Sequence, residues 1–133
     1  MKIEEKLENT KAQMRKGVLE FCILSIIAEE EAYPSDIIKK LKTSDLIVVE
    51  GTLYPMLTRL KNAGLLSYSW KESTSGPPRK YFKLTELGDS FLDSLHQTWN
   101  KLVDAVTQTT NKTKPNKVKR QTTEKIVATD EEE

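Results

Sequence analysis

The sequence predicts a mainly α-helical fold that contains a small β-hairpin and ends in a long helix. Three observations support this class. Apolar residues recur at spacings of three and four in most segments, which is the helical period. Apolar and polar residues alternate in residues 66–72, next to a Gly- and Pro-rich turn. The 133 residues have the length of one ordinary domain, and 37% are hydrophobic, so the expected core is modest and a partner subunit could add to it.

Two helices are predicted at the N-terminus. Residues 3–13 carry Ile3 and Leu7 four positions apart among charged residues, which is a weakly amphipathic pattern. Residues 15–30 are apolar on almost all sides, so we expect them to form the buried central helix. Gly17, near the start of that segment, suits either a helix end or a close helix contact.

The next segments predict a helix, a strand and a helix. Residues 35–43 suit a short helix with Ser35 as its N-cap. Residues 46–49 form a largely β-branched run, which predicts a short strand. Residues 52–63 suit a helix with Thr52 as its N-cap. The inner face of this helix consists of Leu53, Met56, Leu57 and Leu60.

Two residues bear on the ends of the 52–63 helix. Gly64 follows it, at the position where a left-handed backbone conformation commonly ends a helix. Pro55 lies in the first turn if Thr52 is the N-cap, and there a missing N–H loses no acceptor. A helix that began at Glu50 would instead be kinked at the proline.

A hairpin and a last helix follow. Residues 66–72 alternate apolar and polar side chains, which predicts a half-buried strand. Residues 73–78 are Ser, Thr, Gly and Pro and predict a turn, after which residues 80–84 return as the second strand. Thr85 is a suitable N-cap for a long helix that runs to about residue 109.

The order of elements predicts the organisation of the chain. Helix, helix, strand, helix and hairpin make a winged helix-turn-helix, which we place in residues 1–84. Residues 85–111 are expected to be a C-terminal dimerisation helix. Residues 112–133 lack periodicity and carry basic residues first and acidic residues last, which predicts a disordered charged tail.

Composition excludes several classes of protein. No apolar run approaches the ~20 residues that span a bilayer, and the charged N-terminus is unlike a secretory signal, so we expect a cytoplasmic protein. Cys22 and His96 are single residues of their type, which argues against a disulfide framework and a zinc site. Asp89 and Asp93 share a helix face, but no nucleophile or metal set accompanies them. We therefore expect no enzyme, no metal and no cofactor.

Two motifs resemble a known family. The run EGTLYPMLTRLKNAGLL, residues 50–66, resembles the recognition-helix signature of PadR-type transcriptional regulators. The run GPPRKYFKLTELG, residues 76–88, resembles their wing and the start of their C-terminal helix. The resemblance covers roughly residues 14–109 and departs from the family at residues 33–36, Tyr-Pro-Ser-Asp. A single helix after the wing is similar to the short subfamily, which includes multidrug-sensing repressors.

Double-stranded DNA is the partner that this fold and the charge distribution predict. The net charge of the whole chain is only +1, but residues 59–83 hold six cations against one acid, Glu72. A recognition helix presents small polar and basic groups to base edges, and a Gly- and Pro-rich wing tip lets cations approach the backbone. Each candidate also has an interpretation without DNA: Tyr54 would be an ordinary surface aromatic residue, and Arg59 a solvated helix charge. Arg79 and Lys80 would be charges that keep a strand edge from aggregating. The candidate DNA-binding residues are Ser35, Lys39, Thr52, Tyr54, Thr58, Arg59, Arg79 and Lys80.

The last helix carries two apolar stripes, and one would suffice to cover its own domain. The second stripe predicts a homodimer, which suits a palindromic operator. The candidate dimerisation residues are Phe91, Leu95, Trp99, Leu102 and Val106. The resemblance further implies a planar aromatic effector flanked by Trp99 of each subunit; the alternative is that Trp99 only packs in the dimer. The candidate effector-binding residues are Gly17, Glu20, Phe21, Leu92, Leu95, His96, Trp99 and Val103.

Together these features predict a homodimeric, sequence-specific regulator of transcription. A repressor that a small aromatic effector releases from DNA is the specific form that we expect. The alternative from another class is a winged-helix module that has lost DNA binding and pairs with another protein. The cations of the wing favour the first hypothesis over the second.

Overall fold

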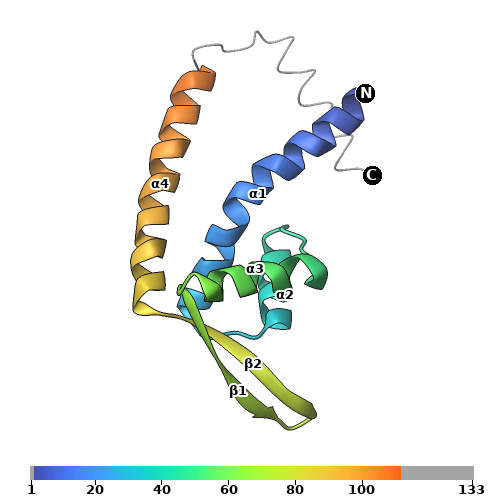
Figure 1. The fold of residues 1–133 in the computed structure, drawn as a ribbon. Coiled ribbons are helices and arrows are strands. Elements are labelled where there is room, and N and C mark those ends of the chain that lie inside the picture. The colour runs from blue at the N-terminus through green and yellow to red at the C-terminus, as the bar shows by residue number, and fades with distance from the viewer. Residues whose placement is uncertain (1, 112–133) are drawn as a thin grey trace. The chain divides into compact units, whose positions relative to one another are not determined.

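The computed structural model describes residues 2–111 and divides the chain into two compact units. The first unit is Met1–His96 and the second begins at Gln97, inside the last helix. The described residues form four helices and one hairpin, and Figure 1 shows how the chain passes through them. These elements are α1 (Ile3–Glu29), α2 (Pro34–Thr43), α3 (Glu50–Asn62), β1 (Leu66–Ser73), β2 (Gly76–Leu84) and α4 (Glu86–Asn111). The order of these elements confirms the predicted mainly helical winged helix-turn-helix. The predicted domain limits, 1–84 and 85–111, stay predictions. Residues 112–133, the predicted tail, lie outside the described residues.

The helix α1 is continuous, so the prediction of two helices, 3–13 and 15–30, was wrong. Gly17 lies in its interior, and a Cβ atom there would meet nothing within 4 Å in this chain. The glycine therefore marks neither a helix end nor a close contact within the described residues. A single glycine costs a helix only about 1 kcal/mol relative to alanine, which is too little to stop an otherwise favourable segment.

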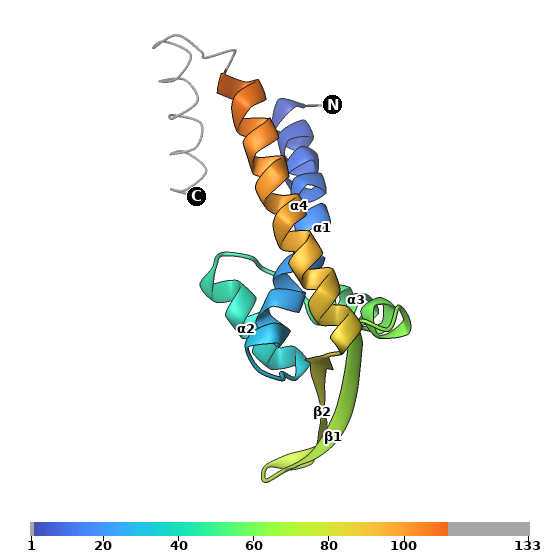
Figure 2. The same cartoon turned by 90° about the vertical axis from the view of Figure 1, so that its left-hand side faces the viewer.

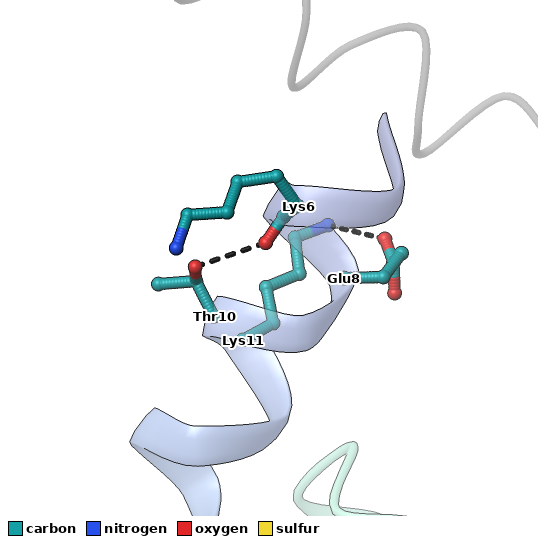
Figure 3. A network of polar contacts seen from close by, with 4 residues as sticks. All are labelled: Lys6, Glu8, Thr10 and Lys11. Atoms are coloured by element: carbon teal, nitrogen blue, oxygen red, sulfur yellow. Dashed lines mark hydrogen bonds and ion pairs between the residues drawn. The ribbon is translucent and has the colours of Figure 1, made fainter. Parts of the chain in front are cut away.

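Two local side-chain contacts in the first half of α1 are drawn in Figure 3. The hydroxyl of Thr10 donates to the carbonyl of Lys6 at 2.9 Å, and Lys11 Nζ lies 3.2 Å from a carboxylate oxygen of Glu8. Both contacts join residues three or four positions apart and lie at the surface. Contacts of this kind stabilise a helix by only a few tenths of a kcal/mol each.

The core of the first unit gathers around the second half of α1. Ile23 and Leu24 are completely buried, and Ile27 is almost so. The side of α2 that faces them contributes Ile37 and Leu41. The remaining buried apolar residues are Ala32, Val48, Leu53, Met56, Leu57, Leu60, Leu65, Leu66, Phe82 and Leu92. The predicted central helix is thus confirmed for its C-terminal half.

The start of α2 differs from the prediction. Pro34 is the first helical residue, and Tyr33 is the N-cap, with no side-chain capping bond. The carbonyl of Tyr33 accepts the N–H of Asp36 at 2.9 Å. Ser35 is therefore inside the first turn and is not the N-cap. The proline explains the shift, because its fixed φ and missing N–H suit the first helical position.

The segment 46–49 is irregular, so the predicted strand was wrong. Its residues alternate, with Val48 buried against the core and Ile47 and Val49 exposed, but no strand within residues 2–111 pairs with them. The extra pairing is made instead by Ala32, which bridges Phe82 of β2. A β-branched run predicts extended backbone, and tertiary contacts decide whether a partner strand is present.

The helix α3 begins at Glu50 with Val49 as its N-cap, not at Thr52. The carbonyl of Val49 accepts the N–H groups of Thr52 and Leu53 at 3.0 and 3.1 Å, which starts the helix two residues earlier than predicted. Pro55 is consequently inside the helix. The inner face was predicted correctly, since Leu53, Met56, Leu57 and Leu60 are all buried.

The C-terminal end of α3 was also predicted correctly. Gly64 has φ = 82°, the left-handed region that favours glycine. Its N–H donates to the carbonyl of Lys61 at 2.9 Å, and the N–H of Leu65 donates to that of Leu60 at 3.0 Å. These two bonds form a Schellman motif, which satisfies the last carbonyls of the helix and turns the chain into β1.

The strands β1 and β2 pair in antiparallel register and form the wing, which Figures 1 and 2 show extending from the helices of the first unit. Leu66 pairs with Leu84, and Tyr68 with Phe82. The strands run closer to the tip than predicted, leaving only residues 74–75 as the turn. The prolines at 77–78 follow Gly76, the first residue of β2, beside a register irregularity, which is a position where a strand tolerates proline.

Thr85 joins the wing, α3 and α4. Its Oγ1 accepts the N–H of Gly88 at 3.0 Å, which confirms the predicted cap, and it donates to the carbonyl of Gly64 at 2.6 Å. Its backbone N–H donates to the carbonyl of Leu65 at 3.1 Å. A Cβ atom on Gly88 would collide with that same Leu65 carbonyl oxygen, so the first turn of α4 lies directly against the end of α3.

The described part of the second unit, residues 97–111, is the remainder of α4. Its large apolar side chains are substantially exposed: Trp99, Leu102, Val103 and Val106. Within residues 2–111, no helix is long and apolar enough to cross a membrane. The same residues contain no group of three or more His, Cys, Asp or Glu side chains placed to hold a metal ion.

Candidate nucleic-acid interface

The outer face of α3 carries four of the predicted DNA contacts, and all four are exposed. Burial of the leucines and Met56 on one side turns the polar residues outward, as the helical period requires. The hydroxyl of Thr58 donates to the carbonyl of Tyr54 at 3.1 Å, so it retains its capacity to accept. Tyr54 is 49% exposed. The four residues are Thr52, Tyr54, Thr58 and Arg59.

Arg59 lies on the side of α3 that faces α1. One guanidinium nitrogen is 3.7 Å from a carboxylate oxygen of Glu20. Both side chains are exposed to solvent in part, so this pair contributes little to stability. The structure thus brings together one residue predicted for DNA and one predicted for the effector. The role of Arg59 as a DNA contact stays a prediction.

A groove of about 1040 Å³ adjoins this ion pair, between α1, the segment 46–49 and the start of α3. Its charged lining consists of Arg15, Lys16, Glu20 and Arg59. Gly17, another of the predicted effector residues, also lies along it. The groove therefore belongs entirely to the first unit.

The two predicted cations of the wing lie on opposite faces of the hairpin. In the register, Lys80 is opposite Trp70, and Arg79 is opposite Lys71. Because successive side chains of a strand alternate, Arg79 and Lys80 cannot share a face. Lys80 Nζ lies 3.8 Å from the ring centroid of Tyr68, on the face that carries the aromatic side chains of β1.

The Arg79 face is the one that meets the linker between α1 and α2. The guanidinium carbon of Arg79 lies 4.6 Å from the ring centroid of Tyr33. Lys71 forms an ion pair with Glu31 and lies 4.9 Å from the ring of Tyr81. Sequence analysis missed Tyr33 and Glu31 as members of this surface. The alternation of side chains along a strand would have placed Arg79 and Lys80 on different faces of the hairpin. No local sequence pattern, however, predicts that the Arg79 face contacts residues 31–33.

The predicted contacts from α2 are Ser35 and Lys39, one helical turn apart. Lys39 is exposed and Ser35 is half-buried in the first turn. The neighbouring Lys40 is instead paired with Glu30 at 3.3 Å. The spacing of four places Ser35 and Lys39 on one side of α2, as a joint contact with a phosphate backbone requires.

The predicted effector residues divide between the two units. In the first, the rings of Phe21 and His96 meet edge to face with centroids 4.8 Å apart. Leu92 is buried in the core and Leu95 is half-buried against it. Trp99 and Val103 belong to the second unit. The effector-binding site therefore stays a prediction.

The single cysteine has no sign of activation. Cys22 is half-buried in α1, and burial raises the pKa of its thiol above the ordinary value. A raised pKa lowers the fraction of nucleophilic thiolate at neutral pH. The side chain therefore behaves as a small apolar residue, as its sequence context predicted.

Comparison with known proteins gives a consistent set of relatives. Residues 23–94 match the model of the family described as Transcriptional regulator PadR-like family. A PadR-like transcription factor from Bacteroides fragilis is 62% identical, with a TM-score of 0.65 over 75% of this chain and 97% of its own. A PadR family regulator from Eggerthella lenta is 30% identical, with a TM-score of 0.73 over 79% and 92%. PadR from Bacillus subtilis, solved with operator DNA, is 22% identical, with a TM-score of 0.54 over 59% and 46%, and shares the fold.

Proposed function

Because the chain belongs to the PadR-like family of transcriptional regulators, we propose that it is a homodimeric repressor that a planar aromatic effector releases from a palindromic operator. The family confirms the resemblance seen in its two motifs and makes the protein a DNA-binding regulator of transcription. It also confirms that the protein is not an enzyme. A cytoplasmic location, where the chromosome is accessible, belongs to the same proposal.

The observation that carries DNA binding is the outer face of α3 beside the wing. Thr52, Tyr54 and Thr58 carry hydroxyl groups and are all exposed, and the buried apolar face of the helix fixes its orientation. Hydroxyl groups can donate to or accept from base edges in the major groove. The wing cations Arg79 and Lys80 are suited to the phosphates beside it. Ser35 and Lys39 of α2 would add backbone contacts on the other side.

The proposal of a homodimer rests on α4. Phe91 in the first unit and Trp99, Leu102 and Val106 in the second are each at least 39% exposed. Leu95 is half-buried against the core and completes the predicted dimerisation set. Contiguous apolar side chains of this size on a helix indicate a partner surface, and symmetric pairs are the commonest solution.

The proposal of an aromatic effector is supported by the chemistry of the predicted residues. Trp99 supplies an indole ring that is 40% exposed, and Val103 follows it by one turn. Phe21 and His96 form an aromatic pair in the first unit. Planar ligands gain about 0.5–1.5 kcal/mol from each good aromatic contact beyond area burial. A ligand that prefers one arrangement of the dimer shifts DNA affinity by its differential affinity for the two arrangements.

Selection of DNA fragments by the purified protein tests the central claim. Random duplexes bound at increasing salt are sequenced, and enrichment of a palindrome with half-sites one helical turn apart is the expected result. Binding that shows no sequence preference would contradict a specific operator. Failure to retain any duplex at low salt would instead favour the winged-helix protein-interaction module.

A further inference from the structure

The linker between α1 and α2 is hydrogen-bonded to the wing through an isolated antiparallel bridge between Ala32 and Phe82. The N–H of Ala32 donates to the carbonyl of Phe82 at 3.1 Å, and the N–H of Phe82 donates back at 2.8 Å. Side chains alternate along extended backbone, so the side chains of Glu31 and Tyr33 lie on the side of the linker opposite to that of Ala32. They accordingly meet the face of the hairpin that carries Arg79.

Three contacts hold that face to the linker. Lys71 of β1 forms an ion pair with Glu31. The rings of Tyr33 and Tyr81 meet at a centroid distance of 5.2 Å. The guanidinium of Arg79 lies over the Tyr33 ring, with 4.6 Å from its central carbon to the ring centroid. All five residues belong to the first unit.

We propose that Tyr33 is a positioning residue of the DNA-binding surface, which holds the Arg79 guanidinium in place for a phosphate of the operator. Tyr33 is also the N-cap of α2, so its ring ties the wing to the helix that precedes the recognition helix. A guanidinium that lies over a ring retains the N–H donors at its edge, and these match a phosphate oxygen pair. The aromatic contact therefore restrains the cation without consuming its hydrogen bonds. This inference rests on the proposed DNA-binding function.

Lys80 provides a matched control within the same strand. It is the next residue, carries the same charge and also lies over a tyrosine, but that tyrosine is Tyr68 of β1. Tyr33 lies at the other face of the hairpin, with Arg79. A general weakening of the wing would change the contributions of both cations. Loss of positioning by Tyr33 would change that of Arg79 alone.

The experiment is a pair of double-mutant cycles on operator affinity. The substitution Tyr33→Leu retains apolar bulk and removes the aromatic face, and Tyr33→Phe retains the ring. We expect Tyr33→Leu to weaken binding about 2- to 5-fold per wing, the range of an exposed cation–π contact, and Tyr33→Phe to bind like the wild type. Tyr33→Leu should have little further effect once Arg79→Ala is present, whereas it should add fully to Lys80→Ala.

A measurement on the free protein makes the outcomes distinguishable. The Arg79 side-chain NMR signals should show a ring-current shift in wild type and Tyr33→Phe, and lose it in Tyr33→Leu, with circular dichroism unchanged. Additive effects of Tyr33→Leu and Arg79→Ala, or equal coupling to Lys80, would overturn the inference while leaving DNA binding intact. Retention of the ring-current shift in Tyr33→Leu would overturn it as well. A wild-type protein that retains no duplex would overturn the proposed function, and this inference with it.

Discussion

At the scale of single residues, the basic character of residues 59–83 is reduced by partners outside that segment. Arg59 is paired with Glu20, and Lys71 with Glu31. Glu20 lies on α1 and Glu31 just after it, so the formal charge of the segment overstates its unpaired positive charge. Arg79 and Lys80 have aromatic partners instead, and an aromatic ring does not neutralise a cation.

The first prediction concerns these two wing cations. Replacement of both Arg79 and Lys80 by alanine should weaken binding to all DNA sequences alike, because phosphate contacts carry no sequence information. The slope of log Kd against log salt should fall by about one unit for each cation removed from a phosphate, and a filter-binding salt titration measures it. Lys11→Ala is the control, since that lysine is paired with Glu8 far along α1 from the wing. An unchanged slope in the double variant would remove the wing from the interface.

At the scale of elements, the junction of α3, the wing and α4 depends on Gly88. The glycine lies against the Leu65 carbonyl, and its N–H is capped by Thr85. The same carbonyl accepts the N–H of Thr85. Three elements therefore share one small set of backbone contacts, and a displacement at this point affects all of them.

The second prediction tests that junction. Gly88→Ala should lower the free energy of unfolding by about 1–3 kcal/mol, because the added methyl group has no space beside the Leu65 carbonyl. Urea unfolding at one fixed protein concentration measures the change. Gly51→Ala is the matched control, since a Cβ atom there meets nothing within 4 Å. Equal stability of the two variants would show that α4 moves away from Leu65 without cost.

The helix α4 also bears on assembly. Trp99, Leu102, Val103 and Val106 lie within about 100° of arc on a helical projection, and all are exposed in the single chain. The opposite side of the helix carries Gln97, Lys101, Asp104 and Gln108. This distribution separates a candidate subunit contact from a solvent-facing side within the second unit.

At the scale of the whole molecule, the third prediction concerns the dimer. Leu102→Glu with Val106→Glu should convert the protein to a monomer, because two unpaired carboxylates would be buried in the contact. Sedimentation velocity measures the change. Gln97→Glu with Gln108→Glu adds the same charge to the other side and should leave the dimer intact. Truncation after Asn111 should also leave it intact. A dimeric Leu102/Val106 variant would place the contact elsewhere.

The fourth prediction concerns the effector. A panel of planar cationic dyes and phenolic acids should quench the fluorescence of wild type, and Trp99→Ala should abolish the effect, because the indole supplies the stacking surface. Trp70 in β1 remains in both proteins as an internal reference, and it is 64% exposed. Ligand affinity that is unchanged in Trp99→Ala, or no binding across the panel, would make Trp99 a packing residue only.

The features that were predictable are those that neighbouring residues define. The inner face of α3 follows from its helical spacing, and the end at Gly64 follows from the one residue type that favours positive φ. The cap at Thr85 and the presence of a strand at residues 66–72 are equally local. The predicted half-burial of that strand was wrong beyond Ser67, because the wing extends away from the core and leaves Tyr68 and Trp70 exposed. The predicted start of α3 was wrong because the sequence pattern is compatible with either Val49 or Thr52 as the N-cap. The backbone hydrogen bonds to the carbonyl of Val49 decided between them.

The sequence by itself determined the class of fold, the family motifs and the candidate DNA-binding face, because helical and strand periods act over a few residues. Only the tertiary structure decided which surfaces meet. It joined Glu20 to Arg59 and Arg79 to Tyr33, and it paired Ala32 with β2 instead of giving the 46–49 run a partner. The reason is physical: these contacts join segments far apart in the chain, and their geometry depends on how the core packs between them.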